Sequence, residues 1–294
     1  MPTNRSQKTK ITILQAASLE HLPWLVHGFS TRGRGASRAY GGNALNLGFT
    51  KEDSRAAVER NRAAFLQQLG AIEGRKTWPL VTLRQFHSDL IHLISGPMNH
   101  PLAGDGMVTA TPGILLAIQT ADCLPIVLAD VKLRAVGVFH AGWRGTIKRI
   151  AEKGVGEMRR CFGSLPRNLQ AAIGPGVHNC CYEVGSEVRS QFESQFAYAE
   201  TLFHEVLESD PVREKYPLLF LTARAPGHSE LPKKIFLNLA EANRRQLLDA
   251  GVSAKNIHVS PHCTVCRLDL FFSYRAERGK TGRLMAVAGI RHKR

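Results

Sequence analysis

Two short apolar runs separated by a few polar residues constrain the fold of this chain most strongly. Leu124 to Asp130 and Arg134 to His140 are rich in β-branched side chains and nearly free of charge, which is typical of two strands of a buried hairpin. Both faces of each run are apolar, so we expect a sheet that is covered on both sides. A turn at residues 131–132 places Cys123 opposite His140 on one sheet face.

A thiol and an imidazole in these positions have the chemistry of metal ligands. Opposed residues have Cβ atoms roughly 5 Å apart, and two zinc ligands need donor atoms a little under about 4 Å apart. A catalytic zinc needs a third protein ligand and one open position. His87 ends an apolar run beside residues able to accept hydrogen bonds, which makes it the strongest candidate, and spacing alone leaves His27, His178 and His262 open.

The composition indicates one globular domain of mixed strands and helices. With 294 residues, 44% of them hydrophobic, the chain can bury a large core. Amphipathic helices that end in glycine are predicted over Arg55–Gly70, Thr146–Gly163 (with Thr146 as its N-cap) and Phe236–Gly251, between strand-like runs. No repeat or linker divides the chain. We therefore predict an α/β (α+β) domain of mixed β-sheets flanked by helices over residues 23–294, after a basic tail at residues 1–22.

The charge balance favours anionic small molecules over nucleic acids as partners. The formal charge is +15, but the basic residues are scattered, with no run of five and no patch interleaved with aromatic residues. The polar N-terminal stretch and the interrupted apolar runs favour neither a signal peptide nor a membrane span, so we predict a soluble, cytoplasmic protein without a membrane partner.

Six cysteines in a chain of this length do not indicate a disulfide framework. In a reducing compartment they are expected to be thiols or metal ligands. Cys180, Cys181, Cys263 and Cys266 raise a second, structural zinc site as a weaker alternative, because adjacent cysteines are poor ligand spacing and one Cys-x-x-Cys pair is a weak signal.

Seven motifs, in order along the chain, resemble those of one protein family. They are "HGFSTRGRG…LNLG", "QFHS", "GDGMVT", "TADCLPIVLAD", "HAGWRGT", "AAIGPGVHNCCYEVG" and "FFSYRAERGKTGR". Together, from about His27 to Ile290, they resemble the YfiH/LACC1 family, whose members have been called polyphenol oxidases (laccases) and peptidoglycan-editing factors. One departure is Ala44, which stands where many relatives have a serine.

The resemblance implies a fold, a metal and a reaction. The fold is a YfiH-like α/β domain, distantly similar to the CNF1-like cysteine hydrolases. The metal is Zn²⁺, with Cu²⁺ as an alternative, bound by His87, Cys123 and His140. The activities are phosphorolysis of adenosine, inosine and methylthioadenosine, and hydrolytic deamination of adenosine, so the expected partners are a purine nucleoside and phosphate. The hairpin pairs Cys123 with His140 independently of this resemblance.

Four further positions are candidates for catalysis or phosphate binding. In deamination, zinc-activated water attacks C6 of adenine and a nearby acid moves the proton. Asp122 is the nearest carboxylate in sequence, although its side chain is expected on the opposite strand face and a structural role is equally open. In phosphorolysis, Arg144 is placed to hold phosphate where a turn enters a helix. Ser30 and Arg32 of the "FSTR" loop form a second candidate cradle for the anion.

Two residues are matched through the motifs alone. Asn46 keeps the amide of "LNLG", and Tyr274 lies in "FFSYR"; both are expected to line the substrate pocket, although a packed turn explains Tyr274 equally well.

Three alternatives to the zinc nucleoside enzyme stay open on sequence grounds. The first is a cysteine-type hydrolase or amidase acting in peptidoglycan precursor editing, with Cys123 as nucleophile and His140 as base. The second is a copper-dependent polyphenol oxidase, but the chain has no H-x-H pair, so such activity is expected only from copper taken up at a soft site. The third is an anion- or nucleic-acid-binding protein without chemistry.

Overall fold

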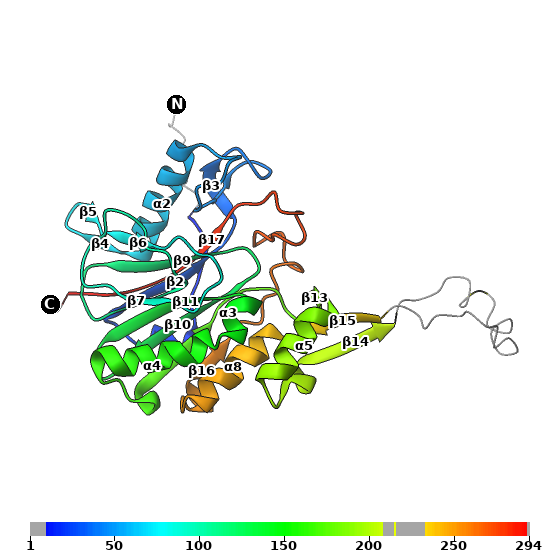
Figure 1. Cartoon of the computed structure of the whole chain (residues 1–294). Coiled ribbons are helices and arrows are strands. Elements are labelled where there is room, and N and C mark those ends of the chain that lie inside the picture. Colours follow the sequence, from blue (N-terminus) through cyan, green and yellow to red (C-terminus); the bar gives the residue numbers. More distant parts are fainter. Residues whose placement is uncertain (1–9, 208–214, 216–232, 293–294) are drawn as a thin grey trace, which may run out of the picture. The chain divides into compact units, whose positions relative to one another are not determined.

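The computed structural model describes residues 10–207, 215 and 233–292, which fall into two compact units. The larger unit comprises Met1–Val177 and Leu239–Arg294, and the smaller comprises His178–Asn238. The two large β-sheets both belong to the larger unit (Figure 1).

Two mixed β-sheets form the centre of the larger unit. The order of the first sheet is β1 (Ile13–Leu14), β2 (Leu25–Ser30), β17 (Leu284–Ile290), β9 (Leu115–Thr120) and β6 (Leu80–Thr82). The order of the second is β16 (Ile257–Val259), β12 (Leu169–Ile173), β10 (Leu124–Asp130), β11 (Ala135–Ala141), β8 (Gly106–Thr109) and β7 (Ile91–Leu93). Side chains from both sheets, such as Phe29, Ile118, Val127 and Val136, form one core between them. The sheets therefore pack face to face, and β1 lies within the segment predicted as a tail.

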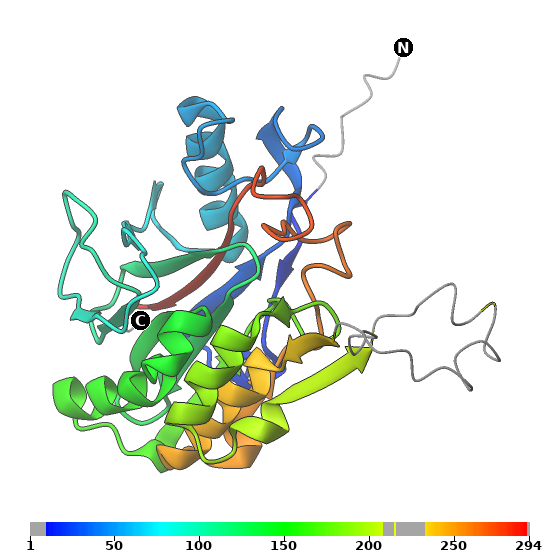
Figure 2. The same ribbon diagram turned by 45° about the vertical axis from the view of Figure 1, so that its right-hand side comes forward.

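Helices cover the outer faces of the two sheets. On the first sheet, α2 (Arg55–Leu69) contributes Phe65 to a core cluster that also contains Val26 of β2 and Val287 of β17. On the second lie α4 (Ile150–Phe162) and α8 (Leu239–Asp249), as Figures 1 and 2 show. This arrangement of helix, sheet, sheet and helix confirms the predicted mixed α/β class.

Shorter elements complete both units. In the larger unit they are α1 (Ala17–Glu20), β3 (Gly33–Ser37), β4 (Ile72–Glu73), β5 (Lys76–Thr77), α3 (Trp143–Ile147) and 3-10 turns at Pro166–Asn168 and Ala254–Asn256. In the smaller unit the described elements are β13 (Glu183–Val184), α5 (Ser186–Gln195), a 3-10 turn (Ala199–Leu202), β14 (Phe203–Leu207) and β15 (Lys233–Leu237). Its core includes Phe192, which contacts the rings of Phe196 and Phe203. Within the described part of the chain, no helix has both the length and the apolar character to cross a bilayer.

The predicted hairpin forms, but with a different register. Pro125, and not Cys123, pairs with His140. The strands are joined by a loop over residues 131–134, longer than the expected turn, because Asp130 caps it: its carboxylate accepts the N–H groups of Lys132 and Leu133. Cys123 thus becomes a diagonal neighbour of His140 rather than a direct one, although the two side chains still share a face.

The helix predicted over Thr146–Gly163 is in fact two helices. The first, α3, begins at Trp143 with Gly142 as N-cap, and the chain breaks at Arg149, whose φ of 63° lies in the left-handed region. Thr146 lies inside α3 and its hydroxyl donates to the carbonyl of Gly142, so its predicted N-cap role is wrong. The predicted helix over Phe236–Gly251 is shorter, because Phe236 belongs to β15.

The buried His27 makes folding depend on pH. Its side chain on β2 is 2% exposed, its Nε2 accepts the N–H of Ala16, and burial lowers its pKa to about 4. Between pH 6.5 and about 4 the unfolded chain binds a proton at this imidazole that the folded chain does not, so the free energy of unfolding falls as the pH falls, by up to about 3 kcal/mol. Urea unfolding of the wild type and of His27→Gln across this range should give a flatter pH dependence in the variant. Equal slopes would contradict this assignment.

Candidate metal centre

Three side chains from separate segments of the larger unit converge beside the second sheet. His87 lies in the loop between β6 and β7, Cys123 immediately precedes β10, and His140 lies near the end of β11. Their donor atoms all lie within 4.8 Å of one another, and the Cys123 Sγ is 3.6 Å from the His87 Nε2. The structure thus brings together the three residues implied by the resemblance. His27 and His262, in the same unit, lie outside this group, and His178 belongs to the smaller unit.

A buried carboxylate, Asp105, organises this centre. It accepts the backbone N–H groups of Phe86, His87 and Ser88 and the Ser88 hydroxyl, which fixes the loop that carries His87. It also contacts the Nδ1 of His140 at 2.7 Å, so the Nε2 of that ring is left for a metal ion. Burial alone raises the pKa of Asp105, but the hydrogen bonds from His140 and Ser88 outweigh it and hold this pKa well below its usual range.

Sequence reasoning missed Asp105, although it lies in the "GDGMVT" motif. An acidic residue directly before an apolar strand was the available signal.

The backbone near the centre adopts unusual conformations. His87 has a φ of 62° and Asp122 a φ of 91°, both in the left-handed region that non-glycine residues rarely enter. Such residues cost on the order of 1–3 kcal/mol and persist where the surrounding structure holds them. At His87, the hydrogen bond from its N–H to Asp105 stabilises this backbone conformation.

Cys123 and His140 form a charged pair in the metal-free chain. Burial opposes ionisation of the Cys123 thiol, but the charge and hydrogen bond of His140, with a smaller effect of His87, lower its pKa to about 6. Burial likewise opposes protonation of His140, but the Cys123 thiolate and the Asp105 carboxylate raise its pKa to about 9. The thiol is therefore ready to act as a thiolate, the form that binds metals and attacks electrophiles.

The donor set fits a zinc ion. Two imidazoles and one thiolate are typical ligands of catalytic zinc, which keeps a fourth position for water or substrate. Asp105 supplies the carboxylate–histidine contact that orients metal-binding imidazoles. Copper prefers the same soft nitrogen and sulfur donors. His87 and Cys123 are both partly exposed, so solvent reaches the group.

The predicted acid, Asp122, is engaged with another segment. Its two carboxylate oxygens accept the Thr264 hydroxyl at 2.7 Å and the Arg275 N–H at 2.7 Å. These contacts tie the loop after β16 and the "FFSYR" segment to the residue that precedes Cys123. Arg144 lies on α3, is exposed, and places its guanidinium 4.2 Å from the centre of the Trp143 ring.

The predicted binding residues Tyr274, Ser30 and Arg32 differ in their exposure and in their hydrogen bonds to the rest of the protein. Tyr274 is 55% exposed. The Ser30 hydroxyl accepts the N–H of Met285, and the guanidinium of Arg32 binds Glu277 at 3.0 Å and the carbonyl of Phe271.

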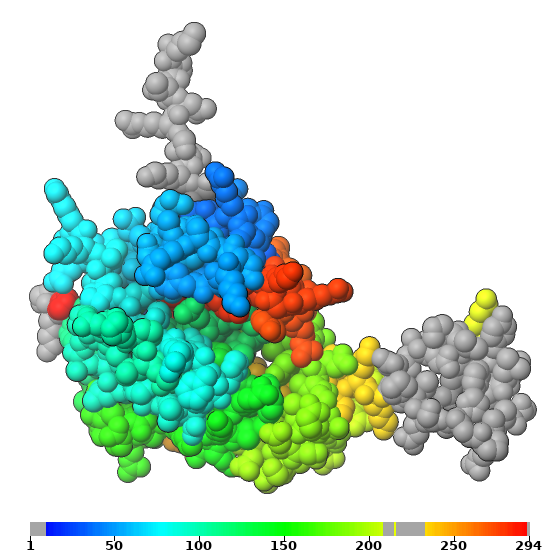
Figure 3. Space-filling model, turned by 45° about the horizontal axis from the view of Figure 1, so that its top comes forward, coloured from blue at the N-terminus to red at the C-terminus, as the bar shows by residue number. Residues whose placement is uncertain are grey.

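Asn46, the remaining predicted binding residue, is fully buried. Its amide bonds Gly48, Asp53 and the N–H of Arg283. It therefore helps to join the segment around residues 33–54 to the segment around residues 270–283. The two lie side by side in Figure 3, in blue and in orange to red.

Gly142 leaves no room for a side chain beside the centre. A Cβ at this position would lie 2.8 Å from the Cys123 Sγ and 2.8 Å from the His87 Cδ2, closer than real Cβ contacts. Hence Gly142→Ala should displace at least one donor and weaken zinc binding by about 10-fold or more. Titration with a competing zinc chelator measures the loss.

Gly156→Ala on α4 is the matched control, because nothing lies within 4 Å of its added Cβ. Equal zinc affinity in the two variants would show that the donors do not bind the metal in the described arrangement.

Comparison with known proteins places the chain in a family. The model of the family described as multi-copper polyphenol oxidoreductase laccase matches residues 26–291. A purine nucleoside phosphorylase from Deinococcus radiodurans is 37% identical, covering 90% of this chain and 88% of the relative. Adenosine deaminase RL5, from an unknown prokaryotic organism, is 35% identical over 88% of this chain and 91% of its own length.

A solved structure shares the fold as well. The crystal structure of the Bacillus licheniformis hypothetical protein YfiH has a TM-score of 0.74 and 30% identity, over 91% of this chain and 93% of that one. This chain therefore belongs to the YfiH family, the multi-copper polyphenol oxidoreductase laccase family by its formal description.

Proposed function

We propose that this protein is a zinc-dependent enzyme of purine nucleosides, which catalyses phosphorolysis of adenosine, inosine and methylthioadenosine and hydrolytic deamination of adenosine. The observation that carries the proposal is the convergence of His87, Cys123 and His140 with Asp105 behind them. Relatives named purine nucleoside phosphorylase and adenosine deaminase, each matching most of this chain, support the substrate class.

In this proposal the residues of the centre have distinct roles. His87, Cys123 and His140 hold the zinc ion, which when bound supplies a Lewis acid able to activate water near neutral pH. Asp105 keeps the Nδ1 of His140 hydrogen-bonded and so directs its Nε2 toward the centre. Because both its carboxylate oxygens are engaged, we assign Asp122 a positioning role, in which it holds the loop of Thr264 next to Cys123.

The two reactions need different groups from the chain. In phosphorolysis a phosphate oxygen bonds to C1′ of the ribose while the C1′–N9 bond breaks and its electron pair leaves with the purine. A cation must hold the phosphate, and Arg144, exposed on α3 three residues after Ala141 at the end of β11, is our candidate. In deamination the oxygen of water bonds to C6 and ammonia leaves. Tyr274, exposed beside the anchored N–H of Arg275, is our candidate to line the nucleoside pocket.

The experiment compares three variants with a panel of nucleosides. Cys123→Ser and His87→Ala should lose zinc and reduce both phosphate-dependent release of adenine or hypoxanthine and formation of inosine from adenosine by at least about 100-fold. Cys161→Ser is the control, because Cys161 lies on α4 and contacts Glu157. Chromatography of each nucleoside incubated with and without phosphate, with elemental analysis of the same samples, gives the readout. Full activity of verified metal-free protein would overturn the proposal.

A cysteine hydrolase is the second candidate, favoured by one geometric observation. Cys123, His140 and Asp105 stand in the order nucleophile, base and orienting acid that cysteine hydrolases use. Under this alternative, iodoacetamide should inactivate metal-free protein toward an amide substrate in parallel with alkylation of Cys123, as followed by mass spectrometry. Amide hydrolysis that survives complete alkylation would exclude the alternative.

A multicopper oxidase is not supported by the donor group. Within residues 10–207 and 233–292, the only candidate metal-binding group that contains histidine is His87, Cys123 and His140, whereas laccase chemistry requires several histidine-rich copper sites. Copper bound at this one soft site would account for oxidase activity if it is observed.

A further inference from the structure

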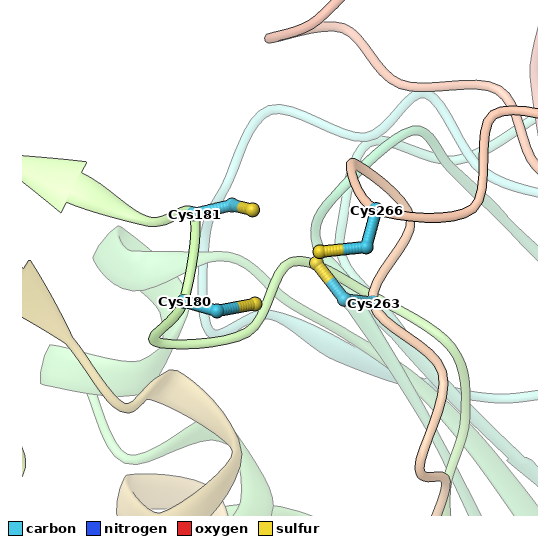
Figure 4. A group of neighbouring side chains, drawn as sticks. All are labelled: Cys180, Cys181, Cys263 and Cys266. Atoms are coloured by element: carbon cyan, nitrogen blue, oxygen red, sulfur yellow. The ribbon is translucent and has the colours of Figure 1, made fainter.

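The loop after β16 carries two thiols that the proposed centre does not use. Cys263 and Cys266 both belong to the larger unit, and their sulfur atoms lie within 4.8 Å of each other. In Figure 4 these two sulfur atoms are turned toward each other. Cys263 is 5% exposed, whereas Cys266 lies at the surface. A Cys-x-x-Cys turn of this kind presents two thiolates to one metal ion.

Backbone contacts within the larger unit fix this turn. Cys263 forms a β-bridge with Gly176, and the N–H of Thr264 donates to the Gly176 carbonyl. The N–H of Arg267 donates to the Cys263 carbonyl, which closes the turn. The Thr264 hydroxyl binds the buried Asp122. The two thiols are therefore positioned by the fold before any ion binds, as a metal-binding pair requires.

The sequence provides a second pair of thiols close to the first along the chain. Cys180 and Cys181 are consecutive residues at the start of the smaller unit, before β13, and Figure 4 labels both. They follow Gly176, the residue bridged to Cys263, by only a few positions. An extended chain spans at most about 14 Å over four residues. Cys180 therefore stays within reach of the Cys263–Cys266 turn by connectivity alone.

Four thiolates are the ligand set of a closed, structural zinc site. Zinc takes four ligands in a tetrahedron, and a site without an open position holds the fold and carries out no reaction. Consecutive cysteines are uncommon in such sites, so spacing in the sequence is weak support for a structural zinc site. The convergence of Cys263 and Cys266 in a fixed turn is stronger support for it.

We propose that Cys263 and Cys266 bind a structural zinc ion whose remaining two ligands are the thiolates of Cys180 and Cys181. This zinc is separate from the proposed enzymatic centre and does not depend on the proposed function. Because a metal site of this type links segments that are far apart in sequence, its binding free energy adds to the free energy of folding.

The test measures zinc in a chain from which the first centre has been removed. In the background His87→Ala/Cys123→Ser, elemental analysis after exhaustive dialysis should find about one zinc ion per chain. Adding Cys263→Ser/Cys266→Ser, or Cys180→Ser/Cys181→Ser, should lower this to near zero. Adding Cys161→Ser, a cysteine on α4, should leave it unchanged. Zinc retained at the same level by either double variant would overturn the proposal.

A second measurement covers variants that fail to fold. The His87→Ala/Cys123→Ser chain, with all four cysteines present, is loaded with Co²⁺ in place of zinc. Tetrahedral thiolate ligation should give intense visible absorption and strong sulfur-to-cobalt charge-transfer bands. A weak, octahedral-type spectrum would overturn the proposal, and so would a mass lowered by two hydrogens, which would show a Cys263–Cys266 disulfide in the purified protein. Because the first centre is absent from this chain, the outcome is independent of the nucleoside assays.

Discussion

The buried carboxylate of Asp105 is the constraint on which the candidate centre depends. A charge removed from water is tolerated in a protein only when hydrogen bonds or an opposite charge compensate it. Asp105 obtains that compensation from three consecutive backbone N–H groups, from the Ser88 hydroxyl and from His140. These donors lie on two segments far apart in sequence. The contacts that compensate the charge of Asp105 therefore also bring His87 and His140 together. The left-handed backbone at His87 follows, because the three N–H groups must turn toward one carboxylate.

The rigid sheets explain how a diagonal pair of residues can serve as ligands. β10 and β11 are buried along their whole length, and both sheets share one core. With Pro125 opposite His140, Cys123 approaches the imidazole from the end of its strand, where the chain leaves the sheet. Gly142, which has no side chain, then allows the start of α3 to pass close to Cys123 and His87. The centre therefore lies at one end of the central strands β10 and β11, where His87 and Cys123 remain partly exposed.

The strands of the hairpin could be predicted from the sequence, but their register and the long-range contacts of the centre could not. Alternation and composition were enough for the hairpin, because β-branched runs report burial directly. The register was wrong because it is set by the loop, where Asp130 caps two N–H groups. Asp105 was missed because the local signal, an acidic residue directly before an apolar strand, does not show that its partner is His140, 35 residues away in sequence. For the same reason, spacing alone left the choice of His87 among several histidines open.

The state of Cys123 determines which chemistry the centre can perform. In the metal-free chain the thiolate is stabilised by His140 and is available as a nucleophile. Once a thiolate binds a divalent ion, its electron pair is committed to that bond, and His140 no longer accepts a proton from it. A hydrolase that uses Cys123 and a metal enzyme that uses the same residue as a ligand therefore exclude each other in one molecule. The soft donor set favours the metal-bound form wherever zinc is present, and this is the physical reason to rank the nucleoside enzyme above the hydrolase.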